Sequence, residues 1–351
     1  MEASRPSSAL PFILAERPVP SRIAAARRIA QPAGRARAHD DSSAYRVEPP
    51  REVERLGHFV GVRADRPAKA DPQQRTHAER LVSRDGYFSP ESVIRKVGNT
   101  PLTPFLGGGP AVLLQVAHPL VAAGIVQHSD YRRDLWRRLG RTLRALYLIT
   151  YGTKAEAERA AEAVQTVHAR IHGKTDVQLG RFPAGTPYSA SDPALMLWVH
   201  ATLVEASLCA YQRFVQTLSP EEQERYYREM ALVARLFGTP ASAIPRSLAD
   251  FRDYFAAQVA SETISVTAPA REVAAVILEA PLPVPMRLLV PAHRLATAGL
   301  LPPRLRHEYR LRWSPLHELA LPLAARSLRV TTTAALIAAS RLAPLPRELA
   351  A

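Results

Sequence analysis

Apolar residues recur at helical spacing through the middle of the chain, and start and stop residues divide them into segments. One segment, residues 107–129 (GGGPAVLLQVAHPLVAAGIVQHS), is apolar almost throughout yet contains His118 and His128. We expect the glycines at its start to form a loop that opens this helix. Further helices are expected from Ser89, over Asp130–Tyr151, from Thr153 to Gly173, from Asp192 to about Thr217, and from Ser219 to Gly238.

The helix starts are well marked. Thr153 and Glu156 have capping-box spacing, and Asp192 and Ser219 each stand as a cap residue directly before a proline. Three or four shorter helices separated by prolines are expected within residues 247–340, and no run of alternating apolar residues predicts a strand. The pattern therefore predicts an all-α protein, a single compact bundle of roughly eight to twelve helices over residues 86–345.

Residues 1–85 lack this periodicity and are rich in Arg, Pro, Ala and Ser. Sixteen basic and eleven acidic residues give this segment a net charge of +5. Such a composition predicts a disordered N-terminal extension.

The whole chain has 351 residues and a net charge of +14. Its basic residues are spread among acidic ones without a dense basic block, which argues against nucleic acid as a partner. The single cysteine, Cys209, excludes an internal disulfide and any metal site built from several thiolates, and we interpret it as a small core residue.

The N-terminus shows no clear signal peptide, and no run of eighteen uninterrupted apolar residues occurs. The pair Arg27-Arg28 is not followed by an apolar region. We therefore expect a cytoplasmic protein, with peripheral membrane contact left open.

The candidate chemistry lies in histidines on apolar helical segments: His118, His168, His172 and His200. A buried imidazole without a partner costs free energy, so several of them suggest a buried polar ligand or a metal cofactor. His168 and His172 are four residues apart, but no Glu follows His168 as in zinc proteases, and no Glu-x-x-His pair of a di-iron bundle occurs. A haem, which needs one axial histidine and an apolar pocket, fits better.

Four segments together carry a resemblance to a known family: HPLVAAGIVQHS, RxxRT, VHARIHG and YSASDPALMLWVHATL. They resemble the helical oxygenases that include the latex clearing proteins (rubber oxygenases) and the endoplasmic-reticulum oxygenase of mycophenolic acid biosynthesis. The likeness spans about Gly86 to Leu321. It implies haem b in a helical core, an axial histidine on the iron, and cleavage of carbon–carbon double bonds in isoprenoid chains with dioxygen.

The resemblance also implies roles for single residues. VQTVHARIHG matches the segment that carries the axial histidine, which makes His168 the implied iron ligand. Arg138, Arg141 and Thr142 match an Arg-x-x-Lys-Thr element near the haem, with Arg141 in place of lysine, a replacement that keeps the charge but changes reach and geometry. Arg138 and Thr142 are then expected to orient or stabilise bound oxygen. His118 and His200 are the other implied cofactor-binding residues.

Other interpretations of these residues stay open, and Arg138 and Arg141 are either part of the site or surface charges. His168 is either the axial ligand or a core histidine bonded to a backbone carbonyl, and His200 either lines the pocket or makes a structural hydrogen bond. His118 either lies beside the pocket or stabilises a kink at Pro119. His128 and His172 are predicted at helix ends, and Tyr188 and Asp192 are best interpreted as loop and cap residues.

The family's rubber-cleaving members are exported, and this chain shows no export signal. We therefore expect a small apolar substrate inside the cell, such as a terpenoid, a prenylated metabolite or a lipid, with dioxygen as the second substrate. The alternative function is a helical protein that binds haem or a lipid without turnover. A third is a metal-free scaffold whose basic N-terminal segment recruits anionic partners.

Overall fold

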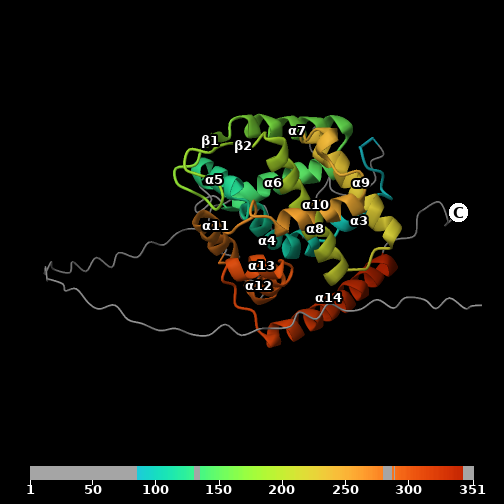
Figure 1. Cartoon of the computed structure of the whole chain (residues 1–351). Helices are drawn as coiled ribbons and strands as arrows, with labels where there is room; N and C mark the ends of the chain where they lie inside the picture. Colours follow the sequence, from blue (N-terminus) through green and yellow to red (C-terminus); the bar gives the residue numbers. More distant parts are fainter. Residues whose placement is uncertain (1–84, 130–134, 280–286, 288, 343–351) are drawn as a thin grey trace, which may run out of the picture. The chain divides into compact units, whose positions relative to one another are not determined.

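The described part of the chain is a bundle of helices with one short hairpin. The computed structural model describes residues 85–129, 135–279, 287 and 289–342, and the side chains of 135–138 and 331–342 lie outside this description (Figure 1). Its elements are α3 (Val93–Gly98), α4 (Leu102–Val116), α5 (Pro119–His128), α6 (Leu135–Tyr151), α7 (Lys154–Ala169), β1 (His172–Lys174), β2 (Pro187–Ser189), α8 (Pro193–Phe214), α9 (Pro220–Leu236), η1 (Ala241–Ala243), α10 (Leu248–Ala260), α11 (Ala268–Leu278), α12 (Val290–Gly299), α13 (Pro303–Glu308) and α14 (Pro315–Leu342).

The predicted all-α class is confirmed, with twelve α-helices in the described part of the chain. The predicted capping boxes and caps also hold: Thr153 and Glu156 begin α7, and Asp192 accepts hydrogen bonds from two amides at the start of α8. The predicted extension, residues 1–85, lies almost wholly outside the described residues, and the domain boundary at residue 86 stays a prediction.

The core is built around α8. This helix packs most closely on α4 and also contacts α9 and α14. Its length and hydropathy would suit a membrane span, but 61% of its most apolar window is buried inside the protein, as expected for a core helix. Trp198 on α8 stacks on Phe255 of α10 at 5.6 Å between ring centroids.

The predicted loop at residues 107–110 is wrong, because α4 runs through all three glycines. Side chains at two of these positions would collide with neighbouring helices. A β-carbon on Gly107 would lie 3.1 Å from the Ala206 carbonyl oxygen of α8, and one on Gly109 would lie 2.2 Å from Thr297 Oγ1 of α12. The glycines therefore permit close helix packing.

The chain bends by 102° between α4 and α5, at His118 and Pro119. His118 N–H bonds to Gln115 O at 3.2 Å, so the Leu114 carbonyl loses its helical partner. The Trp198 indole N–H donates to that carbonyl at 3.2 Å, and the Tyr309 hydroxyl donates to Leu113 O at 2.5 Å. Side chains from α8 and the end of α13 thus satisfy buried backbone groups at the bend.

The C-terminal part also departs from expectation. Five α-helices follow residue 247, and the last, α14, is 28 residues long with Pro322 inside it. A two-stranded antiparallel hairpin, absent from the prediction, pairs His172 with Ser189 and Lys174 with Pro187. Three-residue strands are too short to show alternation in the sequence.

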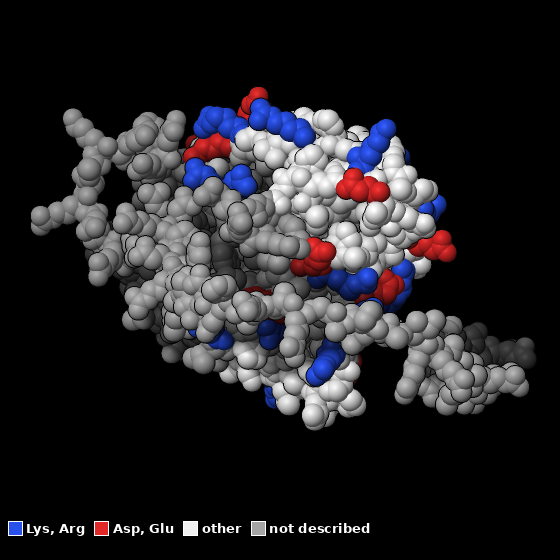
Figure 2. Space-filling model, turned by 90° about the vertical axis from the view of Figure 1, so that its left-hand side faces the viewer, with Lys and Arg blue, Asp and Glu red and all other residues white. Residues whose placement is uncertain are grey.

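One face of the protein bears charges of both signs. On the face shown in Figure 2, basic and acidic side chains lie among each other, separated by uncharged surface. The expectation that nucleic acid is not a partner stays a prediction.

Candidate functional site

His168 lies on the core-facing side of α7. Ala157, Ala161, Val164 and His168 follow one another at spacings of four, three and four, so they share one face of the helix. Both alanines are buried, which places this face toward the interior. The half-buried imidazole keeps its Nδ1 atom shielded from solvent and without a hydrogen-bond partner among the described residues. Burial lowers the pKa of His168, which favours the neutral ring that can bind a metal ion.

The predicted helix end at Gly173 is wrong. Arg170 already caps α7, and the Ile171 carbonyl accepts a hydrogen bond from Ala190 N at 2.8 Å, which draws the backbone into the hairpin. His172 is therefore an exposed strand residue. It neither caps the helix nor shares a face with His168, so the metal-chelating spacing in the sequence does not exist in the fold.

His200 lies in the middle of α8 and is 6% exposed. Neither ring nitrogen has a hydrogen-bond partner among the described residues, so the structural hydrogen bond considered from the sequence is not present there. Burial lowers the pKa of His200 to about 4, and the ring is neutral at pH 7. A buried imidazole with two unused polar atoms is rare in stable cores and indicates a missing partner.

His118 has a structural task. It is the N-cap of α5, and its Nδ1 accepts a hydrogen bond from Leu120 N at 3.3 Å. Its ring lies 5.6 Å from that of Phe182, and burial lowers its pKa to about 4. The interpretation that His118 stabilises the bend at Pro119 agrees with these contacts, and its cofactor-binding role stays a prediction.

Arg138, Arg141 and Thr142 lie on α6, which packs against α7 and is joined to it by Gly152 and Thr153. The side chain of Arg138 is outside the described part of the structure. Arg141 and Thr142 are exposed. The helix of the predicted oxygen-binding element and the helix of His168 are thus neighbours, while the roles of the three residues remain predictions.

The remaining predicted residues have structural partners. His128 ends α5 and its Nε2 lies 3.1 Å from the Tyr188 hydroxyl, which donates to Gln127. Cys209 is half-buried and donates to Glu205 at 3.1 Å, and its pKa is raised by burial.

His293 on α12 belongs to none of the predicted motifs, and its ring lies 5.3 Å from that of Phe105. Thr297, one turn later, is fully buried, and its hydroxyl has no partner among the described residues. The spacing of four between these residues was the only signal in the sequence.

The described residues contain no group of three His, Cys, Asp or Glu side chains that could hold a metal ion. The described residues instead contain single histidines with unused ring nitrogens. A single histidine is enough for haem, because the porphyrin itself supplies four nitrogen ligands to the iron. Two surface hollows are lined by other residues. One, of about 550 Å³, lies at the start of α14, and one, of about 390 Å³, lies between α9 and the residues before α3.

We expect a leucine at position 200 to stabilise the protein, because the two ring nitrogens of His200 lack hydrogen-bond partners among the described residues. In protein purified without added haem, His200→Leu should raise the free energy of unfolding at pH 7 by about 1–2 kcal/mol, because a buried unpaired polar group is removed at similar volume. Wild-type stability should fall as pH drops from 6.5 toward 4, since only the unfolded histidine takes up a proton in this window.

His200→Leu should remove about 2 kcal/mol of that pH dependence between pH 7 and pH 5. Urea unfolding at pH 7 and pH 5 measures both effects, with His307→Leu, an exposed histidine on α13, as the control. A destabilised His200→Leu protein with an unchanged pH slope would show that the ring has a structural partner.

Comparison with known proteins identifies a family. The family described as "ER-bound oxygenase mpaB/B'/Rubber oxygenase, catalytic domain" matches residues 95–333, more than half of the chain. No curated protein and no solved structure matches the chain. The match includes His118 at the start of α5 and the helices α6, α7 and α8, and thus every residue predicted to act at the site. The chain therefore belongs to the mpaB and rubber oxygenase family and carries its oxygenase domain.

Proposed function

We propose that this oxygenase uses haem b, held by His168, to cleave a carbon–carbon double bond of a small apolar substrate with dioxygen. One observation carries the proposal: His168 lies on the buried stripe of α7 with a shielded ring nitrogen that has no partner among the described residues. Its pKa is lowered by burial, so the ring is available as a neutral ligand at pH 7.

When bound, haem b supplies the iron at which dioxygen is activated. The chain's own residues would bind the haem and orient dioxygen. His168 would hold the iron through a ring nitrogen, and the buried Ala157 and Ala161 pack α7, the helix that carries it, against the interior. His200 provides an uncharged polar group in an otherwise apolar stretch of α8. Arg138 and Thr142 are proposed to donate hydrogen bonds that orient dioxygen, with Arg141 as a nearby positive charge.

The proposed reaction conserves both oxygen atoms. One C=C bond breaks, each carbon receives one oxygen atom, and two carbonyl products form, so no external reductant is consumed. An unsaturated isoprenoid or lipid fits this chemistry, and the family name includes rubber oxygenases, which supports a polyisoprenoid-like substrate. A cytoplasmic location is proposed with it.

The experiment combines spectroscopy with turnover. Protein expressed with ample haem supply should show a Soret band, and adding squalene or geranylgeraniol should cause oxygen uptake. With ¹⁸O₂, each carbonyl product should carry one labelled oxygen atom. Absence of haem would contradict the cofactor. Haem without substrate-dependent oxygen uptake across a panel of isoprenoids and unsaturated lipids would instead favour a binding protein.

A further inference from the structure

Helix α14 is apolar on two opposite faces. Its inner face packs Leu321, Ala325 and Leu328 into a small core cluster with residues of α4, α8 and α12. Four large apolar side chains point outward: Leu316, Leu319, Leu323 and Val330, which are 76%, 66%, 66% and 64% exposed. Their spacings of three, four and seven put them on one face. These four make up half of the strongly exposed large apolar residues in the described part of the chain.

Helix α14 is anchored to α8, so its outer face stays exposed in a fixed orientation. Arg329 donates to the carbonyl oxygens of Gln212 and Arg213, the latter at 2.8 Å, at the C-terminal end of α8. The last carbonyls of a helix lack partners within it, and Arg329 satisfies two of them. In Figure 1, α14 runs along one edge of the helical unit, on the side away from α7.

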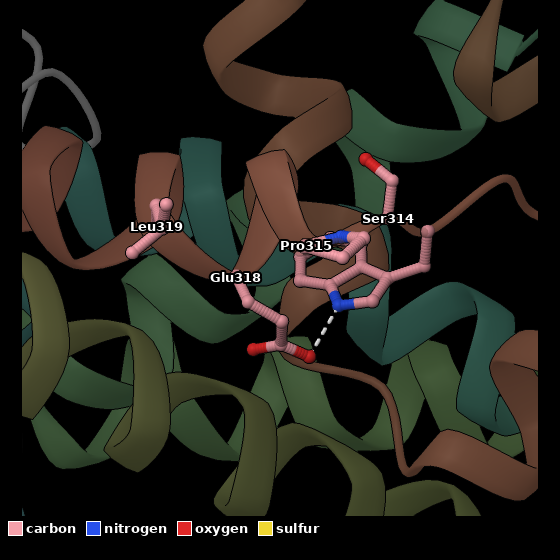
Figure 3. Close-up of a pocket in the computed structure, with 5 residues that line it drawn as sticks. Ser314, Pro315, Glu318 and Leu319 are labelled. Carbon is pink, nitrogen blue, oxygen red and sulfur yellow. Dashed lines mark hydrogen bonds between the residues drawn. The ribbon is translucent and has the colours of Figure 1, made fainter.

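The start of α14 adds an apolar hollow with an indole at its edge. The hollow of about 550 Å³ is lined by Trp313, Ser314, Pro315, Glu318 and Leu319, and Figure 3 shows Glu318 and Leu319 projecting from the first turns of the helix. The Trp313 ring lies 4.0 Å below the Arg306 guanidinium, and its N–H donates to Glu318. Tryptophan is enriched at membrane interfaces, where its apolar ring and polar N–H suit the boundary between lipid and water.

The charge around this face is positive. Residues 303–330 contain six arginines and two glutamates, a net charge of 6 − 2 = +4. Both glutamates are paired with arginines: Glu308 with Arg304 at 2.7 Å, and Glu318 with Arg306 at 3.7 Å. The exposed Arg310, Arg312 and Arg326 have no carboxylate partner among the described residues.

We propose that the outer face of α14, with the Trp313 hollow, binds an anionic lipid bilayer surface. Exposed leucines on one helix face with arginines beside them match a helix that lies in the plane of a membrane interface, its apolar side chains below the headgroups. The arginines contact acidic headgroups, which makes binding salt-dependent. This inference uses different residues from the proposed function, so either can fail without the other.

The test uses full-length protein and sedimentation with vesicles of phosphatidylcholine and phosphatidylserine at about 3:1. Leu319→Glu/Leu323→Glu should lower the partition constant at least tenfold. The matched control, Val177→Glu, changes a side chain that is 60% exposed outside α14, and it should bind like wild type. Arg312→Gln/Arg326→Gln should weaken binding to these vesicles and leave any residual binding to pure phosphatidylcholine unchanged. Circular dichroism and melting temperature check that each variant is folded.

Three outcomes would overturn the proposal. Wild-type protein that does not sediment with the vesicles contradicts it directly. Undiminished binding by Leu319→Glu/Leu323→Glu would transfer the contact to another part of the chain, such as its basic N-terminal segment. A wild-type dimer in analytical ultracentrifugation that the same variant dissociates, without vesicle binding by the wild type, would assign the face to a second copy.

Discussion

Replacing His168 by alanine should abolish the haem binding proposed for this protein. In the proposed function a His168 ring nitrogen would coordinate the haem iron, so its loss should lower haem content at least tenfold in protein expressed with ample haem supply. The Soret band at fixed protein concentration and a pyridine haemochrome assay measure this loss. The imidazole is only half-buried and makes no hydrogen bond among the described residues, so we expect the fold to survive.

The neighbouring His172 provides the matched control. It lies four residues further on, is exposed on β1, and should be replaceable by alanine with full haem content. Added imidazole should restore a Soret band to His168→Gly by occupying the vacated ligand position. If His168→Ala retains its haem, the ligand is another histidine, and His200 on α8 is the next variant to test.

Two adjacent glycines of α4 should respond to alanine with opposite signs. At Gly109 a methyl group would meet Thr297 Oγ1 at 2.2 Å and His293 Nε2 at 3.1 Å, inside a packed interface with α12. We expect Gly109→Ala to lower the free energy of unfolding by about 2 kcal/mol, the usual cost of overfilling a core. At Gly108 no atom lies within 4 Å of the position that a methyl group would take, so alanine there should add about 1 kcal/mol through helix propensity.

Thermal and urea unfolding of the two single variants tests this prediction. Gly109→Ala combined with Thr297→Ala provides a further check, because removing the threonine hydroxyl takes away the closest collision. The double variant should be more stable than the sum of the two single effects predicts. Equal effects of alanine at 108 and 109 would show that α12 does not pack on α4 as described.

The sequence predicted most helix starts because caps act locally. Thr153 with Glu156, Asp192 before Pro193, and Ser219 before Pro220 all begin helices where expected, since each cap satisfies amides within three residues of itself. The glycines of α4 were wrongly predicted to form a loop, because the residues that require glycine there are far away in the sequence. Gly109 accommodates Thr297, and nothing near residue 109 in the sequence reveals that contact.

The candidate site was also predictable only where local sequence determines it. His168 and His200 could be identified by their apolar helical surroundings, and both have unused ring nitrogens in the structure. The spacing of His168 and His172 alone could not show that they lie on different elements. Helix α7 ends between them, where Ala190 N–H donates a hydrogen bond to the Ile171 carbonyl, and Ala190 is distant in the sequence. For Arg141 the sequence left a site role and a surface role open, and in the structure Arg141 and Thr142 are exposed.

The bend between α4 and α5 has a consequence for the order in which the chain matures on the ribosome. The carbonyl of Leu113 accepts a hydrogen bond from the hydroxyl of Tyr309, 196 residues later. A growing polypeptide cannot complete this corner until nearly all of the domain has been translated. Until then the apolar side chains around the bend between α4 and α5 are exposed, and chaperones recognise such surfaces.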